Sequence, residues 1–322
     1  LGASGCGKSL TLQCIAGVLS PDEGYIKLGG RTLFDADRKI NLPPKKRNVG
    51  YMFQQYALFP NMTVLQNVMC GVRGGSHAEK RAEAEKYIAI SRLSGLERKK
   101  PAELSGGERQ RCALARLLVS NPEVILMDEP FSALDDYLRW QLELELADTL
   151  RSFDGPSVFV SHSRDEVYRI CNSVCVLERG HSESAREVHA LFREPVTLSA
   201  SLISGCKNYS RAERTPDNRV NALDWGVTLT ADGDIPDDMR FIGVRAHFIH
   251  PSHDNDDVNV IPCEVVRVID DVLNTVVMLA TPIGNTGYSL LRAEMPKETW
   301  ASLDNPKTLP VSIDKADIMM LR

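Results

Sequence analysis

Residues 2–9 constrain the fold of this chain more than any other stretch of its sequence. They read Gly2, Ala3, Ser4, Gly5, Cys6, Gly7, Lys8 and Ser9. The pattern G-x-x-x-x-G-K-S predicts a loop whose glycines turn the backbone tightly, so that its N–H groups cradle phosphate at the start of a helix. Lys8 would reach the β- and γ-phosphates, and Ser9 would ligate Mg²⁺. A glycine-rich turn before an ordinary helix is the alternative for this stretch alone.

A phosphate-binding loop normally follows a buried strand that delivers it. The chain starts at Leu1, without an initiator methionine and with one residue in front of the loop. We therefore expect an N-terminally truncated chain that lacks the first strands of its nucleotide domain.

Composition narrows the class of protein. The length of 322 residues suits about two domains, and 43% hydrophobic with 25% charged residues is typical of a soluble globular chain. A net charge of -5 gives no basic footprint, which argues against a nucleic-acid partner. Because no apolar run approaches the roughly 18 residues that span a bilayer, we expect any membrane role to involve partner subunits. The eight cysteines are scattered, as expected of reduced thiols.

Strand and helix patterns alternate along the first part of the chain and then give way to short runs rich in β-formers. The apolar run 124–127, bounded by turn residues, predicts a parallel strand covered on both faces. We predict an α/β domain over 1–195 with a helical insertion over about 56–120. A linker over 196–214 would lead to a small all-β domain over 215–322.

Asp128 and Glu129 end the predicted strand 124–127, where open α/β sheets place their ligands. Gln54 stands at the end of a predicted strand 49–53, and His162 at the tip of a predicted strand 157–161. Asp128 would hold Mg²⁺, and the adjacent Glu129 would polarise an attacking water, since one carboxylate on the metal is poorly placed to act as the base as well. His162 would contact the γ-phosphate and orient Glu129. Gln54 would meet Mg²⁺ and the water. Each could instead be an ordinary strand-end residue, with Gln54 a solvated amide.

The stretch 104–110, Leu-Ser-Gly-Gly-Glu-Arg-Gln, is the most specific signal in the chain. Ser105, Gly106 and Gly107 at a helix start predict a second anion site, with Ser105 as the N-cap. One nucleotide needs only one phosphate loop, so we expect this stretch to close over ATP bound to a second copy of the chain. A simple capped helix start is the alternative.

Together these motifs resemble the ATP-binding cassette family of P-loop ATPases. The matching residues are the phosphate loop 2–9, the glutamine Gln54, the signature 104–110, the pair Asp128-Glu129, the SALD loop 132–135 and the histidine His162. The resemblance covers roughly 1–195. It implies an ATP hydrolase that uses Mg²⁺ and works as a head-to-tail dimer with two sandwiched ATP molecules, Ser105, Gly106 and Gly107 acting in trans. The adenine-stacking aromatic residue of the family would lie upstream of Leu1.

Residues Gln54–Val68 are similar to the segment with which importers of the sugar, sulfate and molybdate type grip their membrane subunits. The resemblance implies two membrane permease subunits as partners, an indirect extracytoplasmic solute-binding protein, and a place at the cytoplasmic face of the cell membrane. Exposed apolar side chains would form a groove for a partner helix. A core-facing loop is the alternative.

The β-rich tail resembles the oligonucleotide-fold-like barrel that follows the cassette in these importers, and Ser204–Asn208 looks like the ATPase subunits of molybdate importers. The expected solute is molybdate or tungstate, with sulfate the nearest competitor. By the same resemblance the tail 215–322 would bind the oxyanion and inhibit hydrolysis. A soluble cassette ATPase acting on ribosomes or DNA is the second class considered, and a binding module without hydrolysis the third.

Overall fold

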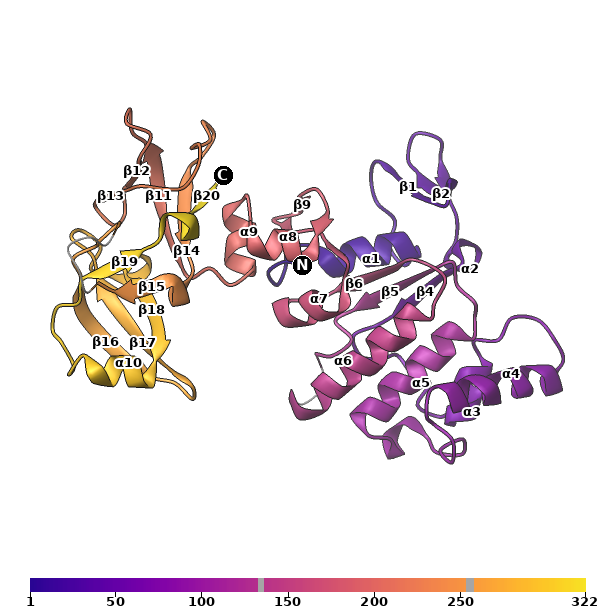
Figure 1. The fold of residues 1–322 in the computed structure, drawn as a ribbon. Helices are drawn as coiled ribbons and strands as arrows, with labels where there is room; N and C mark the ends of the chain where they lie inside the picture. Colours follow the sequence, from indigo (N-terminus) through magenta and orange to yellow (C-terminus); the bar gives the residue numbers. More distant parts are fainter. Residues whose placement is uncertain (133–135, 253–257) are drawn as a thin grey trace. The chain divides into compact units, whose positions relative to one another are not determined.

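The computed structural model describes residues 1–132, 136–252 and 258–322, and it divides into two compact units, Leu1–Glu183 and Ser184–Arg322. Figure 1 shows helices around a parallel sheet in the first unit and antiparallel sheets in the second. In the part of the chain that is described, no helix has both the length and the apolar character needed to cross a membrane.

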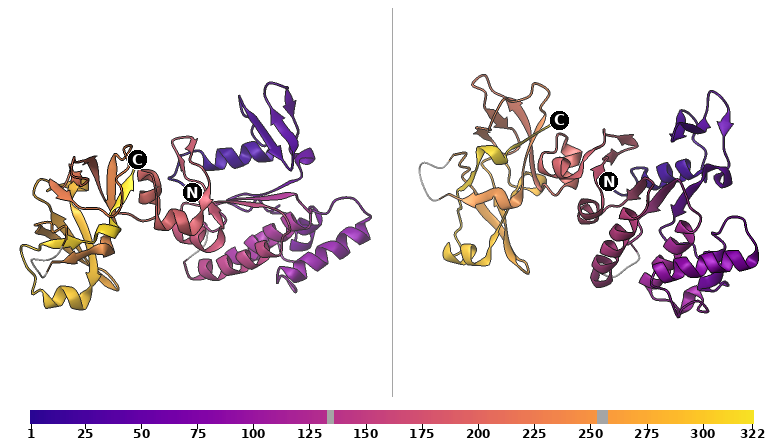
Figure 2. Two further views of the ribbon diagram at one scale, coloured as in Figure 1. Left: turned by 45° about the horizontal axis from the view of Figure 1, so that its top comes forward. Right: turned by 45° about the vertical axis from the view of Figure 1, so that its right-hand side comes forward.

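A parallel sheet forms the centre of the first unit, with the strand order β4-β5-β6. Its strands are β4 (Val49–Met52), β5 (Val124–Asp128) and β6 (Ser157–Val160). Every residue of β5 is buried, as predicted for 124–127. Val124 and Leu126 pack with α1 (Lys8–Ala16), whereas Ile125 and Met127 pack with α5 (Gly106–Leu118) and α6 (Asp136–Arg151). The helices therefore cover opposite faces of the sheet (Figures 1 and 2).

Helix α1, which follows the phosphate loop, ends at Ala16 because Gly17 takes a left-handed conformation with φ 80°. An antiparallel sheet of β1 (Tyr25–Leu28), β2 (Arg31–Asp35) and β3 (Ile40–Asn41) follows, and the short helix α2 (Pro44–Arg47) comes after it.

The predicted helical insertion contains four helical segments. They are α3 (Val64–Met69), α4 (His77–Ile90), the 3-10 turn Pro101–Glu103 and α5. Each of the three α-helices starts at a capping box, with Thr63, Ser76 and Ser105 as the N-caps. Ser105 is thus the cap that the sequence predicted. The remaining elements of this unit are α7 (Arg164–Ile170), β7 (Ser173–Val174), β8 (Leu177–Glu178) and β9 (His181–Ser182).

The second unit is built mainly of antiparallel sheets, including a five-stranded sheet in the order β13-β12-β11-β14-β20 and a three-stranded sheet β16-β17-β18. Its strands are β10 (Arg186–Glu187), β11 (Asn208–Arg214), β12 (Val220–Ala222), β13 (Val227–Leu229), β14 (Phe241–Val244), β15 (Ile249–Pro251), β16 (Glu264–Asp270), β17 (Asn274–Ala280), β18 (Leu291–Pro296), β19 (Val311–Ile313) and β20 (Met319–Leu321). Its α-helices are α8 (Val188–Arg193), α9 (Leu198–Ile203) and α10 (Lys297–Ser302).

The range 196–214, predicted as a linker, is folded in the structure. It contains α9 and β11, and β11 is the central strand of the five-stranded sheet. The inward residues of β11 alternate with the period of a strand, but two of them, Asn208 and Ser210, are polar. Because these inward residues are polar, the alternation of apolar and polar residues that predicts a strand is missing from the sequence of β11.

Arg47 fixes the end of α1 although it lies outside every motif of the sequence. Its guanidinium is fully buried and donates to the carbonyl oxygens of Cys14 (2.6 Å), Ile15 (2.8 Å) and Leu42 (2.7 Å). Carbonyl groups of a last helical turn lack intrahelical donors. Arg47 supplies a donor to Ile15 and adds a second one to Cys14, whose carbonyl also accepts from the N–H of Gly17 at 3.2 Å. Because α1 carries the phosphate loop at its other end, this contact also positions the loop.

We expect Arg47→Leu to lower the free energy of unfolding of the first unit by about 3 kcal/mol, because buried carbonyls lose a charged donor. Urea unfolding of the full-length protein measures this. Arg38→Leu is the matched control, since the Arg38 side chain is 72% exposed. Equal stability of the two variants would contradict the capping role of Arg47.

Candidate functional site

The phosphate loop has the backbone geometry that its glycines predict. Gly5 and Gly7 have φ values of 81° and 105°, which side-chain-bearing residues rarely adopt. Gly7 is the N-cap of α1 and offers no side chain to it. The first N–H groups of α1 therefore remain available to an anion, which the helix dipole also favours.

The back of the loop packs against the segment that follows β7. A Cβ added to Gly2 would lie 2.3 Å from the carbonyl oxygen of Leu177, so only glycine fits there. The N–H of Leu177 donates to the Leu1 carbonyl at 2.8 Å, and the N–H of Gly180 donates to the Cys6 carbonyl at 3.2 Å. These bonds hold one side of the loop, while Ala3 and Ser4 are exposed on the other.

Lys8 and Ser9 point to different partners. The Lys8 side chain is buried, and its ammonium group donates to the carbonyls of Gly2 (2.9 Å) and Ala3 (2.8 Å), which closes the loop around it. The hydroxyl of Ser9 donates to Oδ1 of Asp128 at 2.8 Å. The first turn of α1 and the end of β5 therefore meet through Ser9 and Asp128, as the two motifs require.

Asp128 has a second partner that the sequence analysis missed. The Tyr51 hydroxyl donates to Oδ2 of Asp128 at 3.0 Å. Burial, together with the Asp128 carboxylate, raises the pKa of Tyr51, so the phenol remains a donor at neutral pH. Tyr51 lies on β4 beside β5. The signal in the sequence was a tyrosine within a predicted buried strand, since its hydroxyl needs a hydrogen-bond partner there.

The parallel sheet brings Gln54, Glu129 and His162 together, because each follows the carboxyl end of a neighbouring strand. Nδ1 of His162 lies 3.3 Å from Oε2 of Glu129, and Nε2 of Gln54 lies 3.5 Å from the same oxygen. Glu129 itself has a left-handed backbone with φ 45°, an uncommon conformation that aims its side chain at the sheet edge.

The residues at this edge fit Mg²⁺. Ser9 and Asp128 supply hydroxyl and carboxylate oxygens, the hard donors that Mg²⁺ prefers, and Gln54 lies at the same edge. Within the described ranges, no group of three or more His, Cys, Asp or Glu could hold a metal ion. At nucleotide sites Mg²⁺ is usually bound through one or two carboxylates together with phosphate oxygens and water.

The signature stretch lies at the N-terminus of α5, on the opposite face of the sheet from α1 (Figure 1). The Ser105 hydroxyl accepts from the N–H of Glu108 at 3.3 Å, and Glu108 accepts from the N–H of Ser105 at 2.7 Å. This hydrogen bond lowers the pKa of Glu108. A Cβ on Gly107 would lie 3.1 Å from Leu142, so glycine allows α5 to pack closely on α6.

Two further segments named in the sequence analysis are the SALD loop 132–135 and Gln54–Val68, the second of which was predicted to contact membrane subunits. In the SALD loop, the Ser132 hydroxyl donates to the Glu129 carbonyl at 2.9 Å, whereas 133–135 lie outside the described residues. Within Gln54–Val68, Phe59 is 47% exposed. Val64 and Val68 are buried in the core of α3, α4 and α5, so this half of the segment follows the core-facing alternative.

Ser204–Asn208, the segment that suggested molybdate, is part of the scaffold of the second unit. Cys206 and Asn208 are each 1% exposed. The Asn208 amide donates to the carbonyls of Val244 (3.2 Å) and Arg292 (2.9 Å) and accepts from the Arg292 N–H at 2.6 Å. These contacts give the buried Asn208 a structural role.

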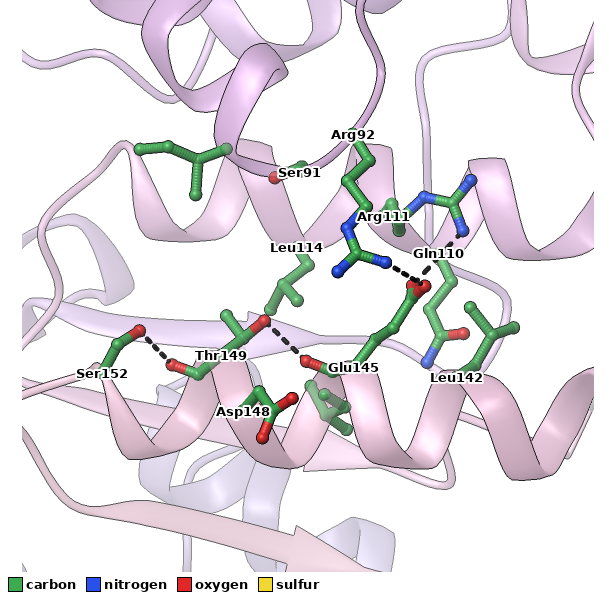
Figure 3. Close-up of a pocket in the computed structure, with 12 residues that line it drawn as sticks. Ser91, Arg92, Gln110, Arg111, Leu114, Leu142, Glu145, Asp148, Thr149 and Ser152 are labelled. Carbon is green, nitrogen blue, oxygen red and sulfur yellow. Dashed lines mark hydrogen bonds and ion pairs between the residues drawn. The ribbon is translucent and has the colours of Figure 1, made fainter.

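A separate cavity of about 250 Å³ lies between α5, α6 and the end of α4 (Figure 3). Three of its charged residues pair with one another, since Arg92 and Arg111 lie 2.9 Å and 3.5 Å from the carboxylate of Glu145, and Asp148 pairs with Arg151 at 3.1 Å. The hydroxyls of Thr149 and Ser152 donate to backbone carbonyls of their own helix end. None of its lining residues belongs to the phosphate loop or the strand ends, so this cavity is not the nucleotide site.

A buried carboxylate supports the segment that carries His162, and the sequence analysis missed it. The hydroxyl of Ser161 donates to Oε2 of Glu166 at 2.6 Å and accepts from the N–H of Ser163 at 2.8 Å. Ser163 in turn caps α7 by accepting from the N–H of Glu166. Residues on both sides of His162 are thereby tied to Glu166, which is 6% exposed. Burial raises the pKa of Glu166.

Comparisons with known proteins show the family to which the chain is related. Residues 1–132 match a family model described as ABC transporter. The spermidine/putrescine import ATP-binding protein of Methylococcus capsulatus is 35% identical over 317 residues, which is 95% of this chain and 79% of that protein. The molybdenum import ATP-binding protein of Paramagnetospirillum magneticum is 32% identical over 295 residues, 87% of this chain and 81% of that protein. The Fe(3+) ions import ATP-binding protein of Haemophilus influenzae is 38% identical over 207 residues, 64% and 58% respectively.

We expect Glu166→Gln to stabilise the protein more at pH 7 than in acid. A raised folded pKa favours the protonated carboxyl in the folded state, so the stability of the wild type falls as pH rises above about 4.5, the ordinary value for glutamate. Glutamine has the same shape, can accept from Ser161 and carries no charge to bury.

Unfolding free energies measured below pH 4.5 and at about pH 7 provide the check, with exposed Glu23→Gln as the control. The gain from Glu166→Gln should grow between the two conditions, whereas the control should change little. A gain of the same size at both values would contradict a charged, buried Glu166.

Proposed function

The chain belongs to the family of ABC transporter ATP-binding proteins, and we propose that it is the ATP-hydrolysing subunit of an importer. Its first unit has the P-loop α/β fold of that family. The observation that carries the proposal is the meeting of Gln54, Glu129 and His162 at one sheet edge, within 3.5 Å of a shared carboxylate oxygen. Beside them lie the phosphate loop and Asp128.

In the proposed site, residues 2–9 bind the phosphates of ATP through backbone N–H groups. Lys8 would exchange its contacts with the Gly2 and Ala3 carbonyls for contacts with the β- and γ-phosphates. Ser9, Asp128 and Gln54 would hold Mg²⁺, which neutralises charge on the phosphates when bound. The hydrogen bond from Tyr51 leaves Asp128 one oxygen oriented toward Ser9.

Glu129 would act as the general base on the water that attacks the γ-phosphate. Its carboxylate accepts the proton of that water as the bond to phosphorus forms. His162 would hold the carboxylate through Nδ1 and contact the γ-phosphate with the other edge of its ring. Gln54 would position the water through its amide. Because Nδ1 of His162 and Nε2 of Gln54 both lie near Oε2 of Glu129, at 3.3 Å and 3.5 Å, we assign the contact with the water to the other oxygen, Oε1.

The site is proposed to be completed by a second copy of the chain. Ser105, Gly106 and Gly107 lie at a helix start whose first N–H groups have no intrahelical acceptor, yet α5 and α1 cover opposite faces of the sheet. A head-to-tail dimer brings this helix start to the phosphate loop of the partner and forms two ATP sites.

Membrane subunits are the proposed partners of the loop after Gln54, where Phe59 is 47% exposed. Two permease subunits would bind there and would receive solute from an extracytoplasmic binding protein. The ATPase would then lie at the cytoplasmic face of the membrane.

For the solute we propose molybdate or tungstate, supported by the resemblance of the tail and by the molybdenum-import relative. A polyamine is the second candidate, because the spermidine/putrescine-import relative matches 95% of the chain. The buried contacts of Cys206 and Asn208 weaken the argument for an oxyanion from that segment. Oxyanion binding by residues 215–322 remains a proposal.

We expect Glu129→Gln to lower ATP turnover by at least about 100-fold, since general base catalysis contributes that much or more, while ATP binding and ATP-bound dimers persist. Steady-state hydrolysis and size-exclusion chromatography with ATP are the measurements. Glu23→Gln, at an exposed position, is the control. Normal turnover in Glu129→Gln would contradict its role.

The same assay identifies the solute when the full-length ATPase is assembled with its membrane subunits and binding protein. Molybdate delivered by the binding protein should be taken up and should stimulate ATP turnover in the wild type but not in Glu129→Gln. Slower turnover with excess molybdate would report the proposed binding to the tail 215–322. If spermidine stimulates ATP turnover and molybdate does not, the transported solute is a polyamine and not molybdate. If the protein co-purifies with ribosomes or DNA and not with membrane subunits, the proposed importer function is wrong.

A further inference from the structure

Tyr56 connects the loop after Gln54, which we propose contacts membrane subunits, to the end of β5, which carries Glu129. It lies in the loop between β4 and α3, and only 5% of it is exposed. Its hydroxyl donates to the carbonyl oxygen of Pro130 at 3.0 Å within the core. Pro130 directly follows Glu129, so this bond holds the peptide next to the proposed general base.

The backbone of Tyr56 is held from the other side by Arg116 of α5. Arg116 donates to the carbonyls of Tyr56 and Ala57, each at 2.9 Å. Its guanidinium also lies 5.3 Å from the centre of the Phe59 ring. One planar side chain thereby connects the signature helix, the backbone at Tyr56 and the half-exposed Phe59.

Unusual backbone conformations lie at both ends of this connection. Tyr56 and Ala57 have left-handed φ values of 60° and 46°, and Glu129 has 45°. Each costs on the order of 1 kcal/mol or more and persists only where surrounding contacts hold it. The bonds from Arg116 and to Pro130 are the contacts that can do so.

Packing alone does not require the hydroxyl. The Tyr56 ring packs in the core with Met52, Leu117 and Phe131, and a phenylalanine ring would fill the same space. Tyrosine adds one donor, aimed at a carbonyl that adjoins Glu129.

We propose that Tyr56 is a positioning residue for Glu129: its hydroxyl holds the Pro130 carbonyl, while Arg116 anchors its backbone to α5 and to Phe59. This inference rests on the proposed ATPase function. A displacement of Phe59 by a partner would reach the general base through Tyr56 and the signature helix through Arg116.

The test compares Tyr56→Phe with Tyr25→Phe in the full-length protein assembled with its membrane subunits; Tyr25 is 69% exposed. We expect Tyr56→Phe to lower kcat for ATP about tenfold, because a misplaced base slows the chemical step, with KM and the melting temperature nearly unchanged. Tyr25→Phe should match the wild type. In a Glu129→Gln background, Tyr56→Phe should cause no further loss, since both changes act on one group.

An unchanged kcat in Tyr56→Phe would overturn the proposal, as would an equal loss in the Glu129→Gln background. A lower melting temperature with an unchanged kcat per folded molecule would show that Tyr56 serves packing only. A wild type that does not hydrolyse ATP would refute the proposed ATPase function itself. Failure of that function can therefore be told apart from failure of the role proposed for Tyr56.

Arg116→Lys tests the anchor, because lysine keeps the charge but cannot bond both carbonyls as a fork. We expect a selective loss of kcat in the same direction as Tyr56→Phe. Arg81→Lys, whose side chain is 58% exposed, is the control. Equal kcat in the two variants would contradict the anchoring role of Arg116.

Discussion

The hydrogen bond between Ser9 and Asp128, 2.8 Å long, is the contact on which the site depends. It joins the first turn of α1 to the end of β5, two segments separated by 119 positions in the sequence. Once that bond places the phosphate loop beside β5, the parallel order β4-β5-β6 places Gln54 and His162 beside Glu129. The chemistry of the site thus follows from one long-range contact and one sheet.

The sequence predicted the parts of this site that depend on local pattern. The phosphate loop needs left-handed glycines and has them at Gly5 and Gly7; the buried strand 124–127 is a continuous apolar run, and Ser105 caps its helix as expected. The β-rich character of the tail also followed from the spacing of its β-formers. Strand β11 within 196–214 did not, because its inward positions include the buried polar residues Asn208 and Ser210.

Contacts between distant segments were not predictable in this way. Tyr51 donates a hydrogen bond to Asp128, and Tyr56 donates one to Pro130, each across more than 70 positions of the sequence. The residues around each tyrosine in the sequence do not indicate its partner. Arg47 and Glu166 are charged residues that hydropathy places at the surface, yet both are buried because neighbouring backbone or hydroxyl groups satisfy them. Such residues determine how firmly the motif residues are held.

The central claim is that each ATP site combines residues 2–9 of one chain with Ser105 of another. Mixing two inactive variants of the full-length protein, Lys8→Ala and Ser105→Arg, tests it by ATP turnover. In a mixed dimer both defects fall in one site and the other site is intact, so mixing should restore hydrolysis that neither variant has alone. Full activity of Ser105→Arg by itself, or no recovery in verified mixed dimers, would contradict the composite site.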